Sequence, residues 1–164
     1  MRVSIMAMTF WLIALSSTTK IVPDGTDDEE IVVDAELLQF REEVAYLSDE
    51  QTPFSGVADK RYENGQKLSR TNYKDGRMEG LLTAWFENGD KEMEGYYKEG
   101  KLNGPYISSW YSNGQKEEEN NWKDGKLDGL WSVWYDNGQK GSEAIYRNGE
   151  LISKKEWDPD GSPI

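Results

Sequence analysis

The chain has 164 residues and a formal net charge of −12, and it contains no cysteine and no histidine. These absences exclude disulfides, thiolate metal sites and catalytic centres that need a histidine base. The negative charge disfavours binding to phosphate backbones and anionic lipid headgroups; it suits a basic partner, or simply keeps a long exposed sheet soluble. Seven Trp and nine Tyr indicate a folded chain that buries large amphipathic rings.

The N-terminal residues have the pattern of a secretory signal peptide. Arg2 precedes a mostly apolar run over 3–15, and Ala14 and Ser16 are small residues at the two positions that a signal peptidase reads. The run is short for a membrane span. We predict a signal peptide over 1–16 and an exported chain, either periplasmic or secreted. A buried N-terminal strand or helix is the alternative.

Residues 17–35 are polar and acidic and are predicted to be a flexible leader. Two interpretations compete for the segment 36–56 that follows. The spacing of four apolar residues suits one stripe of a helix: Leu37, Phe40, Val44 and Leu47. The segment instead ends in TPFSG, and the glycine of this stretch lies one repeat period before the corresponding glycine of the repeats that follow. We therefore predict a divergent lead-in hairpin over 36–56.

Three series of glycines recur with a spacing of 24 or 25 residues. The first follows asparagine in the NG stretches, at Gly65, Gly89, Gly114 and Gly138. The second follows 11 residues later, in YKDG, YKEG, WKDG and YRNG, at Gly76, Gly100, Gly125 and Gly149. The third lies four residues further on, at Gly80, Gly104 and Gly129, with Gly56 one period earlier. Three glycine series in fixed phase indicate a structural repeat.

Each turn motif has a conformational interpretation. Asn-Gly and Asp-Gly between alternating polar and apolar residues favour two-residue hairpin turns, in which both residues have φ > 0. The stretches between turns have the length of β-strands, so each repeat is one hairpin. We predict an all-β fold over 36–164, an elongated antiparallel β-meander in a single twisted sheet. The predicted repeats are 56–80, 80–104, 104–129 and 129–153, with a partial repeat over 153–164.

Stacked repeats place equivalent residues side by side. Two aromatic rows are expected: Trp85, Trp110, Trp134 and Trp157 in one, and Tyr73, Tyr97, Trp122 and Tyr146 in the other. A lysine ladder is expected to form cross-strand ion pairs: Lys67, Lys91, Lys116 and Lys140. The third repeat has one extra residue, and we expect a β-bulge among Ile107, Ser108 and Ser109 to restore register.

The stretch WFENGDKEMEGYYKEGKLNG and its copies resemble the bacterial variant of the MORN repeat. Upstream, Leu38, Arg41, Tyr46 and Pro53–Gly56 resemble the lead-in found in bacterial proteins of that variant. The resemblance covers about residues 36–161 and implies an elongated twisted sheet without catalytic residues. Bacterial proteins of this type include the YwqK-type antitoxins, which implies a partner toxin. Other MORN proteins are scaffolds, or are proposed to contact membranes.

We predict no enzymatic activity, no cofactor and no metal site. Phosphate-binding loop motifs are absent, and the carboxylates of Asp75, Glu99 and Asp124 recur at equivalent turn positions, which turn chemistry explains without catalysis. The stretch DPDG at 158–161 offers oxygen ligands for calcium but lacks the rest of a calcium loop, so we interpret it as an acidic turn. The charge argues against nucleic acid and against strong membrane binding.

The functional prediction is a non-enzymatic, exported module that binds another protein. Under the antitoxin resemblance, the partner is a basic toxin domain. The alternative is an envelope scaffold or membrane-associated MORN protein without a toxin, with self-association through the sheet edges. A carbohydrate-binding surface is a third interpretation, and it requires solvent-facing Trp side chains. The candidate contact residues are Trp85, Phe86, Trp110, Tyr111, Trp134 and Tyr135.

Overall fold

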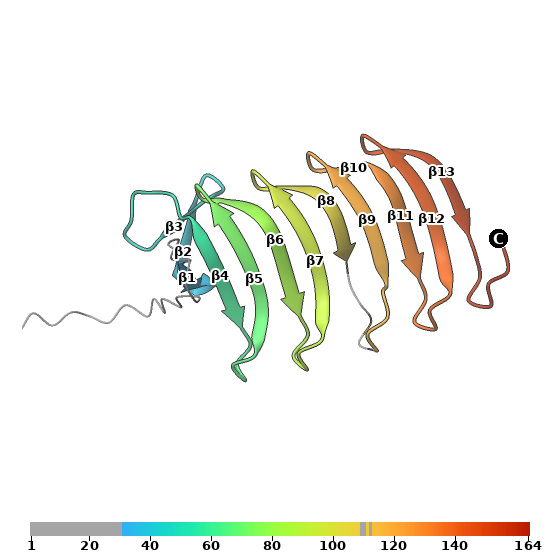
Figure 1. Ribbon diagram of the computed structural model, residues 1–164, viewed down its shortest axis with the longest axis horizontal. Coiled ribbons are helices and arrows are strands. Elements are labelled where there is room, and N and C mark those ends of the chain that lie inside the picture. The colour runs from blue at the N-terminus through green and yellow to red at the C-terminus, as the bar shows by residue number, and fades with distance from the viewer. Residues whose placement is uncertain (1–30, 109–110, 112) are drawn as a thin grey trace, which may run out of the picture.

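The computed structural model describes residues 31–108, 111 and 113–164. The predicted signal peptide, most of the predicted leader and Trp110 lie outside these residues. The described chain is an elongated sheet of curved strands that lie side by side in chain order (Figure 1). No helix within the described residues is long and apolar enough to cross a membrane.

The main sheet has 11 strands in the order β1-β4-β5-β6-β7-β8-β9-β11-β12-β13, and β10 pairs with β9. Its first strands are β1 (Val32–Asp34), β4 (Gly56–Arg61), β5 (Lys67–Lys74), β6 (Arg77–Trp85), β7 (Lys91–Lys98) and β8 (Lys101–Ser108). The others are β9 (Glu118–Lys123), β10 (Lys126–Leu127), β11 (Gly129–Trp134), β12 (Lys140–Arg147) and β13 (Glu150–Glu156). All pairings from β4 onward are antiparallel, which confirms the predicted β-meander.

The N-terminal part departs from a single antiparallel sheet. β1 pairs in parallel with β4, with Val32 opposite Val57, so the main sheet is mixed. The described residues 31–35 therefore include sheet structure where the prediction placed the end of the flexible leader. β2 (Leu38–Arg41) and β3 (Val44–Leu47) form a separate two-stranded sheet.

A short turn explains why the lead-in hairpin leaves the main sheet. β1 already occupies the edge of β4, and the 3₁₀ turn η1 (Ala35–Leu37) then redirects the chain. The carboxylate of Asp34 caps this turn by accepting a hydrogen bond from the Glu36 amide at 2.9 Å. Segment 36–56 thus contains strands rather than the alternative helix, but they pair with each other and not with the repeats.

The lead-in residues form a small core at this end of the sheet. Val33, Phe54 and Ala58 are buried together, and the ring of Phe54 lies 5.9 Å from that of Tyr73. Ala45 of β3 is fully buried and donates a backbone hydrogen bond to the Gly76 carbonyl at 2.8 Å. Terminal repeats of stacked proteins need such a cover, because their outer side would otherwise be unprotected.

The turns after β5, β7, β9 and β12 are the predicted two-residue turns. At the first of them, Asp75 and Gly76 have φ values of 49° and 76°, and Lys74 lies opposite Arg77. The amide of each turn glycine reaches back one repeat, as in the 2.9 Å hydrogen bond from Gly100 to the Met78 carbonyl. We call the side of the sheet formed by these turns the tight-turn edge.

The NG stretches are longer loops, and the prediction of two-residue turns for them is wrong. In the first loop, residues 62–66, Gly65 has a φ of 87° whereas Asn64 is not left-handed. Instead, Asn64 accepts the Gln66 amide on its side-chain oxygen at 2.9 Å, and the Gly65 amide donates to the Tyr62 carbonyl at 2.9 Å. The asparagine acts through its side chain rather than through a positive φ. We call this opposite side of the sheet the NG edge.

β-Bulges occur in several repeats where strands meet the NG loops. The register shifts at Lys60/Arg61, at Ala84/Trp85 and at Val133/Trp134. The bulge predicted among Ile107–Ser109 lies partly outside the described residues. Because these register shifts recur at the same place in several repeats, they belong to the repeat itself and do not compensate for one extra residue.

Candidate functional site

Cross-strand pairing assigns each side chain to one face of the sheet, because opposed residues share a face and successive residues alternate. Leu81 lies opposite Tyr96, and Leu130 lies opposite Ile145. We call the side that carries these four residues the front face. Tyr97 follows Tyr96 in β7 and therefore lies on the back face.

The second predicted aromatic row lies on the back face and serves packing. Trp122 contacts Tyr106 at a centroid distance of 6.4 Å, and Tyr146 contacts Trp131 at 6.1 Å, both edge to face. Burial raises the pKa of Tyr97, and it is the main cause of the raised pKa of Tyr106. These rings fill the space that separates successive hairpins.

The front face exposes an apolar stripe that sequence reasoning missed. Tyr96 is 46%, Leu130 47% and Ile145 46% exposed. Pro105 and Asn121, also exposed and opposed, lie between these two apolar pairs. Tyr96 and Ile145 each directly precede an aromatic residue of the back-face row. Because successive residues of a strand alternate between the two faces, this spacing in the sequence indicates that both side chains lie on the front face.

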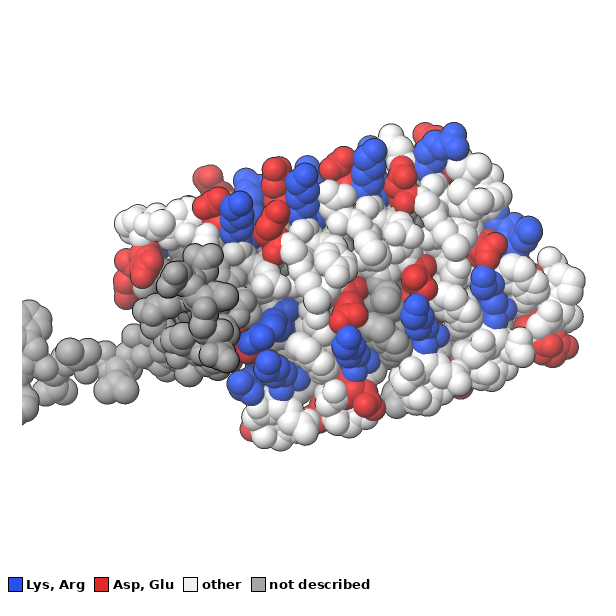
Figure 2. All heavy atoms as spheres, viewed as in Figure 1, with Lys and Arg blue, Asp and Glu red and all other residues white. Residues whose placement is uncertain are grey.

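Below this stripe the front face carries a neutralised row of ion pairs. Lys91, Lys116 and Lys140 each contact a glutamate three residues later, at 2.6, 2.9 and 2.5 Å: Glu94, Glu119 and Glu143. The hydrogen bond from Lys140 is the main cause of the lowered pKa of Glu143. Figure 2 shows blue and red side chains next to one another in the lower part of the visible face, below a mostly white region.

Lys67 confirms the predicted cross-strand pairing, because it reaches Asp59 on β4 at 3.8 Å. The ion pairs of Lys91, Lys116 and Lys140 given above are instead made with a glutamate three residues later. A regular strand would put residues i and i+3 on opposite faces. The bulges opposite Trp85 and Trp134 insert one residue after Lys91 and Lys140, which returns the glutamate to the same face.

Above the stripe, at the tight-turn edge, the front face carries basic side chains directly opposite one another. The pairs are Lys74 with Arg77, Lys98 with Lys101, and Lys123 with Lys126. All six side chains belong to exposed residues. Within the part of the chain that the structure describes, none of the six forms an ion pair.

The predicted contact residues lie where the strands meet the NG edge. Trp85 and Trp134 are half-buried, and a lysine ammonium lies near each ring, Lys67 at 5.9 Å and Lys140 at 5.8 Å from the centroids. A hollow of about 320 Å³ lies beside Trp85, lined also by Gln66, Lys67 and Gly89. These two indoles are thus partly accessible, and Trp110 lies outside the described residues.

The neighbours of these Trp residues are committed to contacts between repeats. The Tyr111 hydroxyl donates to the Trp134 carbonyl, and the Tyr135 hydroxyl to the Trp157 carbonyl, both at 2.9 Å. Phe86 occupies the equivalent place without a hydroxyl and is half-buried. The two tyrosines thus hold successive loops in line, and Phe86 is bonded through its backbone within its own loop.

The five NG-edge loops are acidic. They span 62–66, 86–90, 111–115, 135–139 and 158–162 and contain no lysine or arginine. Their carboxylates are Glu63, Glu87, Asp90, Asp136, Asp158 and Asp160. The loops of this edge thus carry only acidic charged side chains, whereas the front face carries lysines beside its glutamates.

The last loop explains the DPDG stretch without a metal. The Asp158 amide donates to the Ser162 carbonyl, and the Gly161 amide to the Asp158 carbonyl, both at 2.8 Å, as in the other loops. Hydrogen bonds from the side chain and backbone of Ser162 lower the pKa of Asp160. No group of three or more acidic ligands with metal-site geometry occurs among the described residues.

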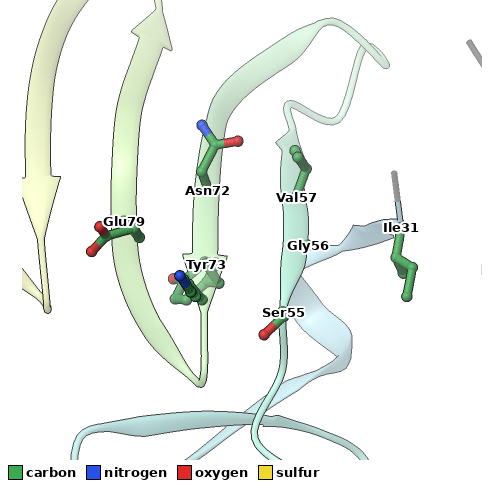
Figure 3. Close-up of a pocket in the computed structure, with 8 residues that line it drawn as sticks. Ile31, Ser55, Gly56, Val57, Asn72, Tyr73 and Glu79 are labelled. Carbon is green, nitrogen blue, oxygen red and sulfur yellow. The ribbon is translucent and has the colours of Figure 1, made fainter. Parts of the chain in front are cut away.

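One further hollow lies on the front face beside β1. It measures about 410 Å³ and is lined by Ile31, Ser55, Gly56, Val57, Asn72, Tyr73, Lys74 and Glu79. Asn72 and Glu79 come from neighbouring strands, and Ile31 closes the far side (Figure 3). Its mixed apolar and polar lining offers contacts for a side chain.

Two segments of the chain, residues 78–99 and 127–148, match the family model described as MORN repeat variant. The first covers most of β6 and β7, and the second covers β11 and β12, so each contains one hairpin around an NG loop. MORN repeats are generally protein- or membrane-binding modules and not a known enzyme family. A search of curated proteins found no match.

Proposed function

We propose that this chain, which contains MORN-variant repeats, is a non-enzymatic module that binds another protein through its NG edge. The observation that carries the proposal is the charge of the five loops, whose own sequences contain six carboxylates and no lysine or arginine. Arg61, from the strand before the first loop, donates to the Gly65 carbonyl at 2.9 Å and is the basic side chain bonded to that loop. Such an edge favours a basic partner. The half-buried indoles of Trp85 and Trp134 lie beside the same loops and add apolar contact area.

The loops are held in fixed positions, which favours binding. Besides the tyrosine hydroxyls, the side chain of Asn113 donates to the Asp136 carbonyl at 3.0 Å, one repeat further on. Loops that recur every second strand are about 10 Å apart. Because these hydrogen bonds hold the loop backbones in place, little loop entropy is lost when a partner binds.

The finer proposal follows the resemblance to the YwqK-type antitoxins. The partner is a basic toxin domain, and the chain neutralises it by covering its active surface. The predicted signal peptide places this encounter in the envelope or outside the cell. An exported neutraliser requires a toxin that acts in, or passes through, the same compartment.

A capture experiment with matched variants tests the NG edge. The full chain is immobilised and exposed to lysate of its own source cells at low and moderate salt. The variant E63Q/E87Q/D136N removes three loop carboxylates. The control E94Q/E119Q/E143Q removes three front-face carboxylates that belong to lysine ion pairs. Both variants change the net charge by the same amount.

We expect one basic protein to bind stoichiometrically to the wild type and the control, and to be lost at higher salt and from the loop variant. Equal capture by both variants would contradict the NG edge as the binding surface. Recovery of only the chain itself, or of several envelope components, would favour the scaffold alternative.

A further inference from the structure

We propose that the front face is a second protein-binding surface, which takes an acidic, amphipathic protein segment laid across the strands. This surface is separate from the NG edge, and its test does not depend on the proposed function above. It combines the basic pairs at the tight-turn edge with the apolar stripe directly below them. The segment would place carboxylates over the pairs and apolar side chains over the stripe.

The basic pairs indicate a binding role, because the fold does not need them. Like charges directly opposite each other in antiparallel strands are destabilising. Here the arrangement recurs in three successive turns, Lys74–Arg77, Lys98–Lys101 and Lys123–Lys126. The next turn has Arg147 opposite Glu150, so the repeat tolerates an attractive pair. A repulsive arrangement kept in three turns favours a role in binding.

The lysine row on the same face provides an internal comparison. Lys91, Lys116 and Lys140 are neutralised by Glu94, Glu119 and Glu143 within 2.9 Å. Both rows recur once per repeat, yet of these two rows only the lower one forms ion pairs within the described residues. The upper row retains its charge for an external carboxylate.

Five carboxylates at the tight-turn edge limit where such a partner can bind. Asp75, Glu99 and Asp124 occupy the left-handed first position of the turns, and so lie at the tips. Glu79 accepts the amide of Glu99 at 2.8 Å, and Asp128 accepts the amide of Asn148 at 2.9 Å. Glu43 of the lead-in hairpin also lines a hollow with Arg77 and Lys101. An external carboxylate therefore meets individual basic pairs with acidic neighbours and not a uniformly positive edge.

The apolar stripe sets the character and length of the segment. The pairs Leu81–Tyr96 and Leu130–Ile145 lie on strands β6, β7, β11 and β12. From β6 to β12 there are five strand spacings, which is about 24 Å. A helix of about 16 residues or an extended segment of about 7 residues spans this distance.

Charge also favours a protein segment over an anionic lipid layer. The chain has a net charge of −12, so a continuous negative surface meets repulsion from the NG edge and the lead-in as well as attraction from the pairs. A narrow segment contacts only the basic row and the stripe. It also supplies apolar side chains at separate points, which matches exposed Tyr96 at one end of the stripe and the exposed pair Leu130–Ile145 at the other.

Synthetic peptides test the proposal by fluorescence anisotropy with the full chain. The probe is a labelled amphipathic peptide of about 16 residues made of Glu and Leu, long enough to span the stripe. An all-Glu peptide of the same length is compared with it. The variant K98Q/K101Q/K123Q removes upper-row charge, and the control K91Q/K116Q/K140Q removes as much from the lower row. L130Q/I145Q removes half of the stripe.

We expect the Glu–Leu peptide to bind the wild type and the lower-row control alike. Binding should weaken about tenfold in the upper-row and stripe variants, a loss of about 1.4 kcal/mol. Equal weakening in both lysine variants, or equal binding of the all-Glu peptide, would overturn the proposal. So would binding of phosphatidylglycerol vesicles, rather than the peptide, with the same dependence on the upper row. Failure here leaves the NG edge proposal standing.

Discussion

The hydroxyl of Tyr62 donates a hydrogen bond to the backbone carbonyl of Trp85, 23 residues later, at 2.8 Å. Tyr111 and Tyr135 make the same contact with Trp134 and Trp157. Each bond joins the NG loop of one repeat to the strand end of the next. The tyrosine two residues before the NG asparagine thus connects one repeat to the next in three of the four repeats, and Phe86 in the remaining one has no hydroxyl for this bond.

The first prediction concerns this connector. Tyr135→Phe should lower the free energy of unfolding by about 0.5–1.5 kcal/mol, because the Trp157 carbonyl loses a half-buried partner. Tyr96→Phe is the control, since Tyr96 is exposed and its hydroxyl has no protein partner among the described residues. Denaturant unfolding of both variants measures the difference. Equal stability of the two would show that the hydroxyl contributes little.

The second prediction concerns the cover over the first turn. Gly76 and Gly100 have φ values of 76° and 79°, so alanine is strained to a similar degree at both. A Cβ at Gly76 would lie 2.3 Å from Val44 Cγ1 and 2.8 Å from the Ala45 carbonyl, whereas at Gly100 its nearest neighbour is 4.0 Å away. We expect Gly76→Ala to cost about 1–3 kcal/mol more than Gly100→Ala.

Thermal or denaturant unfolding compares these two glycine variants directly. A difference confined to Gly76→Ala assigns the extra cost to contact with the lead-in hairpin. Equal costs would mean that the hairpin moves aside easily and does not act as a fixed cover of the repeats.

The third prediction concerns the first repeat's own ion pair. Asp59 is 7% exposed and accepts two hydrogen bonds from Arg70, at 2.7 and 3.0 Å. Arg70→Met should cost about 1.5–3 kcal/mol, because a buried carboxylate loses its main partner. Lys140→Met breaks a more exposed pair and should cost at most about 1 kcal/mol.

A double-mutant cycle with Asp59→Asn tests whether that cost belongs to the pair. If Arg70→Met costs as much in the Asp59→Asn background as in the wild type, the arginine acts through packing of its stem and not through the carboxylate.

The fourth prediction concerns alkaline pH. Burial is the main cause of the raised pKa of Tyr73, Tyr97 and Tyr106 relative to the ordinary value of 10.0. The folded state therefore holds these protons more tightly than the unfolded state. Their contribution to stability is full below about pH 10 and is lost as the pH rises through the folded pKa values. Phenolate absorbance and circular dichroism, followed together, should show late ionisation and unfolding in one transition.

The prediction would be wrong if all tyrosines ionised near pH 10 while the sheet stayed folded. Phenols that are buried in the folded sheet should ionise only at a higher pH.

The repeat and its hairpins were predictable from the sequence, because their causes are local. Positive φ at the tight turns favours Gly76 and its equivalents, and alternation of side chains divides strands into two faces. The packing row of Tyr97 and Trp122 followed from the same period. These signals need no knowledge of distant contacts, so glycine phase and aromatic phase were sufficient for a meander.

What the tertiary structure decided depends on neighbours that local rules do not include. The asparagine of each NG loop uses its side chain in place of a left-handed backbone, and bulges place Lys91 and Glu94 on the same face. β1 joins the sheet in parallel, which sends the lead-in hairpin to cover Gly76. The separation of the acidic NG edge from the basic pairs at the tight-turn edge likewise arises only when the hairpins stack. Stacking brings residues that are one repeat apart in the sequence onto the same surface.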